Sequence, residues 1–237
     1  MSTSVAVADH WAVVPAAGIG TRMGAGLPKQ YLPLAGRAVL VHSLQRLLAQ
    51  PRVAGVVLAL AADDPWWPAL GFRSDKPLLT VTGGASRARS VLAALECLGQ
   101  RPPDTPVLVH DAVRPLLHGD DVARLCEAPL DADGCLLAIA LTDTVKRTDA
   151  DGRVLETVPR DGLWAVQTPQ RFLLEPLRVA LTDALAAGLE PTDEAQAMER
   201  AGHRPRLVPG RRDNLKLTVP QDLSLAGCLL AAQEREA

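Results

Sequence analysis

Residues 13–31 read VVPAAGIGTRMGAGLPKQY, and the fold follows from this stretch. The apolar run over residues 11–14 predicts a strand, and it is followed by a cluster of glycines, namely Gly18, Gly20, Gly24 and Gly26. Arg22 and Lys29 add two positive charges. Glycine permits positive φ and close backbone approach, successive free N–H groups bind anions, and cations supply charge. The stretch therefore predicts a strand followed by a phosphate-binding loop.

Two common phosphate-binding patterns do not fit this loop. The Walker pattern needs a Gly-Lys pair, and the chain contains none. The dinucleotide fingerprint GxGxxG fails because Met23 occupies the position of its third glycine. An NAD-binding dehydrogenase is disfavoured for that reason, although Asp63 and Asp64 lie roughly where its ribose-binding acid is expected. What remains is A-A-G-x-G-x-R-M followed by P-K-Q.

Composition indicates one folded domain of moderate size. The chain has 237 residues and a formal net charge of −2, so charge gives no reason to expect nucleic-acid or membrane partners. The four cysteines form no CxxC pair, which favours reduced, mostly buried thiols in a cytoplasmic protein. The N-terminus lacks the pattern of a signal peptide. We expect a flexible tail over residues 1–9 and a single domain over residues 10–237.

Apolar runs of strand length alternate with helical spacing along most of the chain. Strands are expected at 11–14, 53–60, 78–81, 107–109, 135–141, 163–166, 207–208 and 215–218, and helices at 39–48, 90–98, 171–187, 192–201 and 221–232. Continuous apolar strands between helices predict an α/β fold with a Rossmann-like, doubly wound, mostly parallel sheet. Ligands of such sheets bind at the carboxyl ends of strands. The glycine loop and Asp111 both follow strands, so we expect them to face one crevice.

Residues 142–161 are polar, and Asp149-Ala-Asp-Gly152 is a turn signal in their middle. This pattern predicts a projecting β-hairpin arm. Such an arm has little core of its own, so we expect it to pack against a second copy of the chain and form a homodimer.

The glycine loop resembles the signature loop of nucleotidylyltransferases, and its form with Ala16-Ala17 and Pro28-Lys29-Gln30 is most similar to the 2-C-methyl-D-erythritol 4-phosphate cytidylyltransferase family. The resemblance spans roughly residues 13–225. Seven further segments follow in the family's order: Gly83-Gly84 with Arg87 and Ser90, residues 109–115, 143–146, 157–164, 167–170, 192–194 and 213–216.

The resemblance implies the transfer of a cytidylyl group from CTP to 2-C-methyl-D-erythritol 4-phosphate, with release of pyrophosphate, in non-mevalonate isoprenoid biosynthesis. It implies Mg²⁺ as cofactor, with Asp111 as its ligand, and a nucleotidyltransferase-type fold. The implied catalytic residues are Arg22 and Lys29. The implied nucleotide-binding residues are Ala16, Ala17, Gly18, Gly20, Gly84, Ser90 and Asp111. The implied substrate-binding residues are Arg114, Thr144, Arg160, Thr168, Thr192 and Lys216, of which Thr144 and Arg160 reach the neighbouring subunit's site.

The chemistry of this reaction agrees with the residues present. A phosphate oxygen is already ionised at neutral pH, so the nucleophile needs no general base, and cations are needed to offset charge repulsion. One departure from the family is that Ala85 and Ser86 stand where acidic residues often follow the paired glycines. Two alternatives remain: a ribitol-5-phosphate cytidylyltransferase, which would share the CTP half of the site, and a non-catalytic nucleotide-binding protein.

Overall fold

The computed structural model describes residues 9–18 and 27–236. The central sheet consists of β1 (His10–Pro15), β4 (Val53–Leu60), β5 (Leu78–Thr82), β6 (Pro106–Val109), β7 (Cys135–Ala140), β10 (Trp164–Leu173) and β11 (Arg206–Pro209). The helices are the 3₁₀ turn η2 (Lys29–Tyr31), α1 (Val39–Leu48), α2 (Trp66–Ala69), α3 (Arg87–Cys97), α4 (Gly119–Glu127), α5 (Leu174–Ala186), α6 (Glu194–Arg200) and α7 (Pro220–Glu236). Two small sheets pair β2 (Pro33–Leu34) with β3 (Arg37–Ala38), and β8 (Val145–Thr148) with β9 (Val154–Val158).

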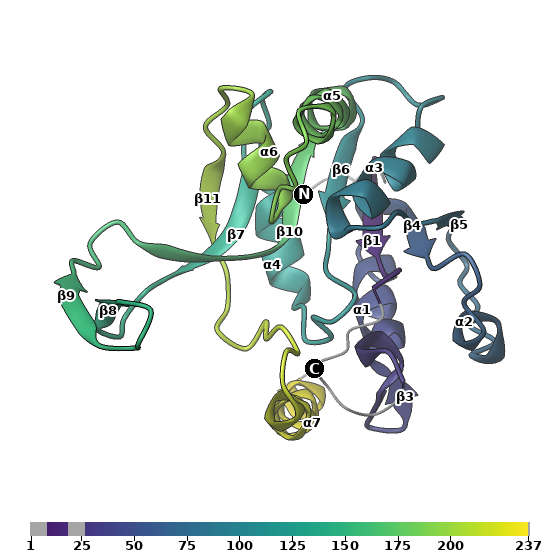
Figure 1. Ribbon diagram of the computed structural model, residues 1–237. Helices are drawn as coiled ribbons and strands as arrows, with labels where there is room; N and C mark the ends of the chain where they lie inside the picture. The colour runs from purple at the N-terminus through teal and green to yellow at the C-terminus, as the bar shows by residue number, and fades with distance from the viewer. Residues whose placement is uncertain (1–8, 19–26, 237) are drawn as a thin grey trace, which may run out of the picture.

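The seven strands lie in the order β11-β7-β10-β6-β1-β4-β5 (Figure 1). β10 runs antiparallel to both of its neighbours, and every other neighbouring pair in this sheet is parallel. The predicted α/β fold with a doubly wound, mostly parallel sheet is therefore confirmed.

Helices cover both faces of the sheet because both faces of its strands are apolar. In β1, Trp11 and Val13 pack with α3, α5 and α6, whereas Ala12 and Val14 pack on the other face with α1 and α4. Successive side chains of a strand point to opposite faces, so a strand buried on both sides is a continuous apolar run. A third cluster packs α7 against the β2–β3 region.

Most expected elements are present, and the differences have local causes. Residues 171–173, expected as helix, belong to β10, because Phe172 pairs with β6 and is fully buried. Residues 215–218, expected as a strand, join no sheet. Helices α2 and α4 were not expected. The cysteines are all unpaired, but Cys97 and Cys228 are exposed, so the expectation of mostly buried thiols holds for half of them.

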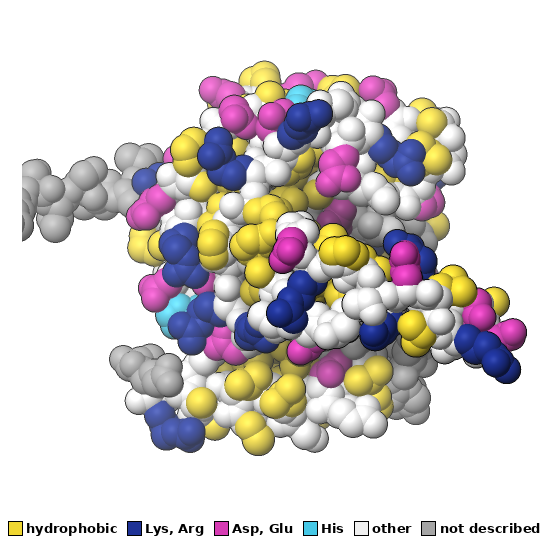
Figure 2. All heavy atoms as spheres, turned by 90° about the vertical axis from the view of Figure 1, so that its left-hand side faces the viewer, with side chains coloured by type: hydrophobic (Ala, Val, Ile, Leu, Met, Phe, Trp, Pro, Cys, Tyr) yellow, Lys and Arg dark blue, Asp and Glu magenta, His cyan; other side chains and the backbone are white. Residues whose placement is uncertain are grey.

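The hairpin β8–β9 extends away from the central sheet (Figure 1). Its pairing runs from Val145 opposite Val158 to Thr148 opposite Val154. Val154 and Leu155 are 61% and 62% exposed, so the arm presents apolar side chains that are largely open to solvent. On the face shown in Figure 2, positive and negative side chains are interspersed.

The register of the sheet places the predicted loop segments at one edge. Val13 of β1 lies opposite Val109 of β6 in a parallel pair, so the carboxyl ends of both strands point to the same edge of the sheet. Ala16 follows β1, Asp111 follows β6, and Gly83 follows β5 at this edge. None of the helices among the described residues is long and apolar enough to cross a membrane.

Candidate active site

A cleft of about 800 Å³ lies at the carboxyl ends of β1, β5 and β6. Ligand pockets typically enclose roughly 300–1,000 Å³, so the cleft has room for a nucleotide. Eight of the predicted site residues line it: Ala16, Ala17, Gly18, Lys29, Gly84, Ser90, Asp111 and Lys216.

One side of the cleft is built from small residues in close contact. A Cβ on Gly83 would lie 2.5 Å from the Cβ of Ala17 and 2.8 Å from Ser90 Oγ, so this position requires glycine. Ser90 Oγ accepts a hydrogen bond from the Gly84 amide at 3.1 Å and donates to the Ser86 carbonyl at 2.9 Å. The tight packing leaves backbone groups at the surface of the cleft, where they can contact a base.

Gln30 holds the start of the glycine loop. Its Nε2 donates to the carbonyl oxygens of Ala16 and Gly18, at 2.7 and 2.9 Å. Its side chain is buried, so the bond to Ala16 is shielded from water, and the bond to Gly18 is partly buried. The P-K-Q segment therefore supports the loop through Gln30 and adds the positive charge of Lys29.

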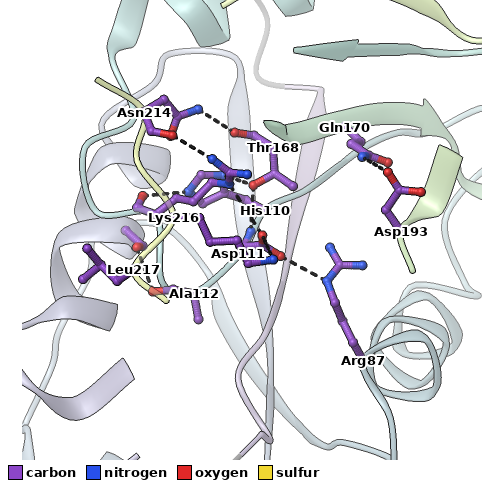
Figure 3. Close-up of polar contacts among 12 residues, drawn as sticks. Arg87, His110, Asp111, Ala112, Thr168, Gln170, Asp193, Asn214, Lys216 and Leu217 are labelled. Atoms are coloured by element: carbon purple, nitrogen blue, oxygen red, sulfur yellow. Dashed lines mark hydrogen bonds and ion pairs between the residues drawn. The ribbon is translucent and has the colours of Figure 1, made fainter. Parts of the chain in front are cut away.

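The other side of the cleft is charged and centres on Asp111. Lys216 Nζ lies 2.8 Å from Asp111 Oδ2, and Arg87 Nε donates to Oδ1 at 3.0 Å. The two cations reach this carboxylate from opposite sides (Figure 3). Arg114 Nε lies 3.5 Å from Oδ2. Burial alone would raise the pKa of Asp111, but Arg87 and Lys216 outweigh it and hold the pKa well below its usual range.

Arg87 also forms a buried ion pair with Glu194. Arg87 Nη1 and Nη2 donate to Glu194 Oε1 and Oε2 at 2.6 and 3.0 Å. Burial raises the pKa of Glu194, and the charge of Arg87 offsets part of that effect. The guanidinium therefore connects two carboxylates from different elements.

The backbone of Asp111 is fixed by a second set of contacts. Its amide donates to Thr168 Oγ1 at 3.0 Å, and this hydroxyl donates to His110 Nδ1 at 3.1 Å. His110 Nε2 donates to the Arg114 carbonyl at 3.1 Å. Asn214 Nδ2 donates to the Thr168 carbonyl at 2.8 Å. Burial lowers the pKa of His110 to about 4, so this imidazole is neutral at pH 7 and serves as a hydrogen-bonding support.

The other seven predicted residues are not among the described residues that line the cleft, and five of them lie within the body of the chain or outside the described residues. Arg114 and Thr168 are buried behind Asp111, and Thr192 is exposed beside α6, with its amide bonded to Gln196 Oε1. Gly20 and Arg22 fall outside the described residues.

Thr144 and Arg160 lie on the exposed arm and do not line the cleft of this chain. Sequence reasoning assigned no role to Arg87, Gln30 or Glu194. All three lie inside quoted motifs, but no local signal marks the pairing of Glu194 with Arg87.

The fold and the cleft define the class of this protein. A mostly parallel sheet with a glycine-lined cleft and several cations at the carboxyl ends of its strands is the arrangement of an α/β nucleotidyltransferase. The family model of 2-C-methyl-D-erythritol 4-phosphate cytidylyltransferase (IspD) matches residues 10–232. The chain belongs to this family.

Individual relatives agree with the family model. The chain is 54% identical over 230 residues to the 2-C-methyl-D-erythritol 4-phosphate cytidylyltransferase of Halorhodospira halophila, a match that covers 94% of this chain and 95% of the relative. It is 51% identical over 222 residues to that of Aeromonas hydrophila, covering 94% and 90%. The crystal structure of the Francisella tularensis 2-C-methyl-D-erythritol 4-phosphate cytidylyltransferase matches with a TM-score of 0.81 at 32% identity, covering 93% of this chain and 99% of that one.

Proposed function

We propose that this chain transfers the cytidylyl group of CTP to 2-C-methyl-D-erythritol 4-phosphate, giving 4-diphosphocytidyl-2-C-methyl-D-erythritol and pyrophosphate. The observation that carries this proposal is the division of one cleft into a side of small residues and a side of cations around a single buried carboxylate. The first side suits a nucleoside, and the second suits phosphate groups.

The residues of the cleft suit a reaction that needs no general base. The attacking phosphate oxygen is ionised at neutral pH, and the described residues that line the cleft include no histidine or cysteine. The neutral, hydrogen-bonded state of His110 supports the same conclusion. Rate acceleration then depends on alignment and on cations placed where negative charge develops.

Each side of the cleft receives a role in the proposal. Ala16, Ala17, Gly18, Gly20, Gly84 and Ser90 bind the nucleoside, and Arg22 and Lys29 stabilise the charge at the α-phosphate. Lys216 binds the phosphate of the second substrate. Arg114 and Thr168, buried behind Asp111, and Thr192, beside α6, complete the proposed substrate-binding set. The 2.8 Å contact of the Lys216 ammonium with Asp111 Oδ2 supports a role for this lysine beside the carboxylate.

A magnesium ion fits the donor set of this cleft when CTP supplies further oxygens. Among the described residues no group of three or more His, Cys, Asp or Glu side chains could hold a metal ion. Mg²⁺ is usually held by one or two carboxylates together with substrate phosphates, and Asp111 supplies one carboxylate. Lys216 shows that Oδ2 of this carboxylate accepts a cationic neighbour at 2.8 Å. When bound, the ion would offset charge on the triphosphate.

The arm supports a homodimer in this proposal. Thr144 and Arg160 lie outside the cleft of their own chain, and exposed Val154 and Leu155 suit burial against a second copy. We place the enzyme in the cytoplasm, in keeping with its unpaired cysteines.

Position-specific labelling of CTP tests the type of reaction. Purified protein is incubated with Mg²⁺, 2-C-methyl-D-erythritol 4-phosphate and CTP radiolabelled at either the α- or the γ-phosphate. The proposal predicts that the α-label enters the polyol product and the γ-label leaves as pyrophosphate. Transfer of the γ-label to the polyol would indicate a kinase, and retention of both labels in CTP would indicate a nucleotide-binding protein without this activity.

A further inference from the structure

Glu194 is a fully buried carboxylate to which the proposed reaction assigns no role. It is the first residue of α6, and its side chain is 0% exposed. Both of its oxygens accept hydrogen bonds from Arg87, which is the first residue of α3. This bidentate pair joins residues 107 positions apart in the sequence.

The same guanidinium determines how Asp111 is held. Glu194 occupies both terminal nitrogens of Arg87, and the remaining Nε donates to Asp111 Oδ1. A bidentate pair fixes the plane of the guanidinium, so the direction of the Nε–H bond is fixed as well. Asp111 Oδ1 is thereby committed to Arg87, and Oδ2 is left for Lys216 (Figure 3).

We propose that Glu194 is a positioning residue of the cytidylyl transfer: acting through Arg87, it fixes Asp111 so that Oδ2, the oxygen that faces the ammonium of Lys216, is the one presented to a divalent cation bound with CTP. The inference rests on the proposed function, because it concerns how that reaction binds its metal–nucleotide complex. Under this proposal, a residue of α6 that does not line the cleft affects how the cleft binds the metal–nucleotide complex.

Stability alone does not account for this pair. Desolvating two opposite charges costs about as much as their attraction returns, and apolar residues of similar volume often stabilise a protein as well or better. A cation at the first residue of α3 also faces the positive end of the helix dipole. A role for the Arg87 guanidinium in holding the carboxylate of Asp111 explains why this buried ion pair is present.

The chain offers a matched control in Glu190. This residue lies just before α6, and its Oε1 is 3.1 Å from Arg89 Nε on α3. The pair links the same two parts of the chain, but its side chains are 49% and 48% exposed, and no contact among the described residues joins it to Asp111. Glu190→Gln therefore removes the same charge without disturbing the Arg87–Asp111 bond.

Calorimetric titration of CTP, in excess Mg²⁺ and again in EDTA, tests the inference on the full-length protein. For Glu194→Gln we expect the Mg²⁺-dependent gain in CTP affinity to fall by about 10–100-fold, the usual effect of losing a residue that orients a metal ligand. Affinity in EDTA should stay within about twofold of wild type, and Glu190→Gln should match wild type in both buffers. Arg87→Lys keeps the charge but loses the planar fork, so it should resemble Glu194→Gln, and it carries the test if Glu194→Gln does not fold.

A double-mutant cycle with Asp111→Asn separates positioning from a general structural role. If Glu194 acts through Asp111, Glu194→Gln should cause no further loss of Mg²⁺-dependent affinity in the Asp111→Asn background. An equal loss of affinity with and without Mg²⁺, a full additional loss in that background, or a lowered Tm with wild-type CTP binding would each overturn the inference. Absence of CTP binding by the wild-type protein would instead overturn the proposed function itself, and this inference with it.

Discussion

Lys29 lies at the start of η2 on the surface of the cleft, with Nζ 3.4 Å from the carbonyl oxygen of Leu217. Its proposed role is to balance charge at the α-phosphate. We predict that Lys29→Ala lowers kcat/KM by roughly two to three orders of magnitude, because loss of one such contact leaves transition-state charge uncompensated. Steady-state pyrophosphate release measures the effect, and an unchanged Tm shows that the fold is intact.

Lys76 provides the control for this substitution. Its Nζ donates to the carbonyl of Gln50 outside the cleft, so Lys76→Ala should keep normal turnover. Near-normal turnover by Lys29→Ala would contradict the catalytic role of Lys29.

His10, the first residue of β1, predicts how stability depends on pH. Its side chain is fully buried, Nε2 has no hydrogen-bond partner among the described residues, and burial lowers its pKa from 6.5 to about 4. The unfolded chain therefore takes up a proton at higher pH than the folded chain does. The stabilisation is complete above pH 6.5 and is lost as the pH falls towards 4. At pH 5 the loss should be about 2 kcal/mol in the free energy of unfolding.

Urea unfolding of the wild type and of His10→Asn, at neutral pH and at about pH 5, checks this value. The variant cannot bind that proton in either state, so its stability should fall by about 2 kcal/mol less between the two conditions. The same pH dependence in both proteins would contradict the assignment.

At the level of whole elements, periodicity predicts helices and strands in which apolar positions recur, and it misses short elements. Helix α1 has the residues 39–48 that the sequence predicts, because its apolar side chains recur on one face. The boundary before α5 is wrong by three residues, since an antiparallel strand buried on both faces and a buried helix both appear as apolar runs. Helix α4 has few apolar positions, namely Val122, Leu125 and Cys126, in too short a segment to be predicted.

The position of the hairpin arm leads to a prediction about mixtures of two inactive variants. Arg160 lies at its base, where Nη1 donates to the carbonyl of Thr142, outside the cleft of its own chain. If Arg160 serves the neighbouring cleft, Arg160→Ala and Lys29→Ala should each be inactive alone. Their heterodimers should contain one intact cleft, so free exchange of subunits in an equal mixture should restore about a quarter of wild-type activity, by the symmetry of a dimer.

Arg153→Ala, in the exposed turn of the same arm, is the matched control and should remain active without a partner variant. Mixtures shown by tag pull-down to contain heterodimers, yet without any recovered activity, would mean that the arm serves its own chain.

For the molecule as a whole, general rules predict the position of the cleft but not the contacts between the side chains that form it. The rule that ligands bind at the carboxyl ends of parallel strands locates the start of the glycine loop, at Ala16, together with Asp111, and the structure brings both into one cleft. No such rule pairs Arg87 with Glu194, because this contact joins helix starts far apart in the sequence and depends on how α3 and α6 pack. The segment 213–218 illustrates the same limit. Its residues 215–218, predicted as a strand, join no sheet, and Asn214 and Lys216 make tertiary contacts at the cleft.

The most direct test of the central claim compares two polyol phosphates as acceptors. Pyrophosphate release is measured with purified protein, CTP and Mg²⁺, in the presence of either 2-C-methyl-D-erythritol 4-phosphate or ribitol 5-phosphate. Our account predicts release with 2-C-methyl-D-erythritol 4-phosphate and none above background with ribitol 5-phosphate. Release with ribitol 5-phosphate alone would contradict the proposed substrate while leaving the CTP half of the cleft in place, and no release with either acceptor would contradict the account as a whole.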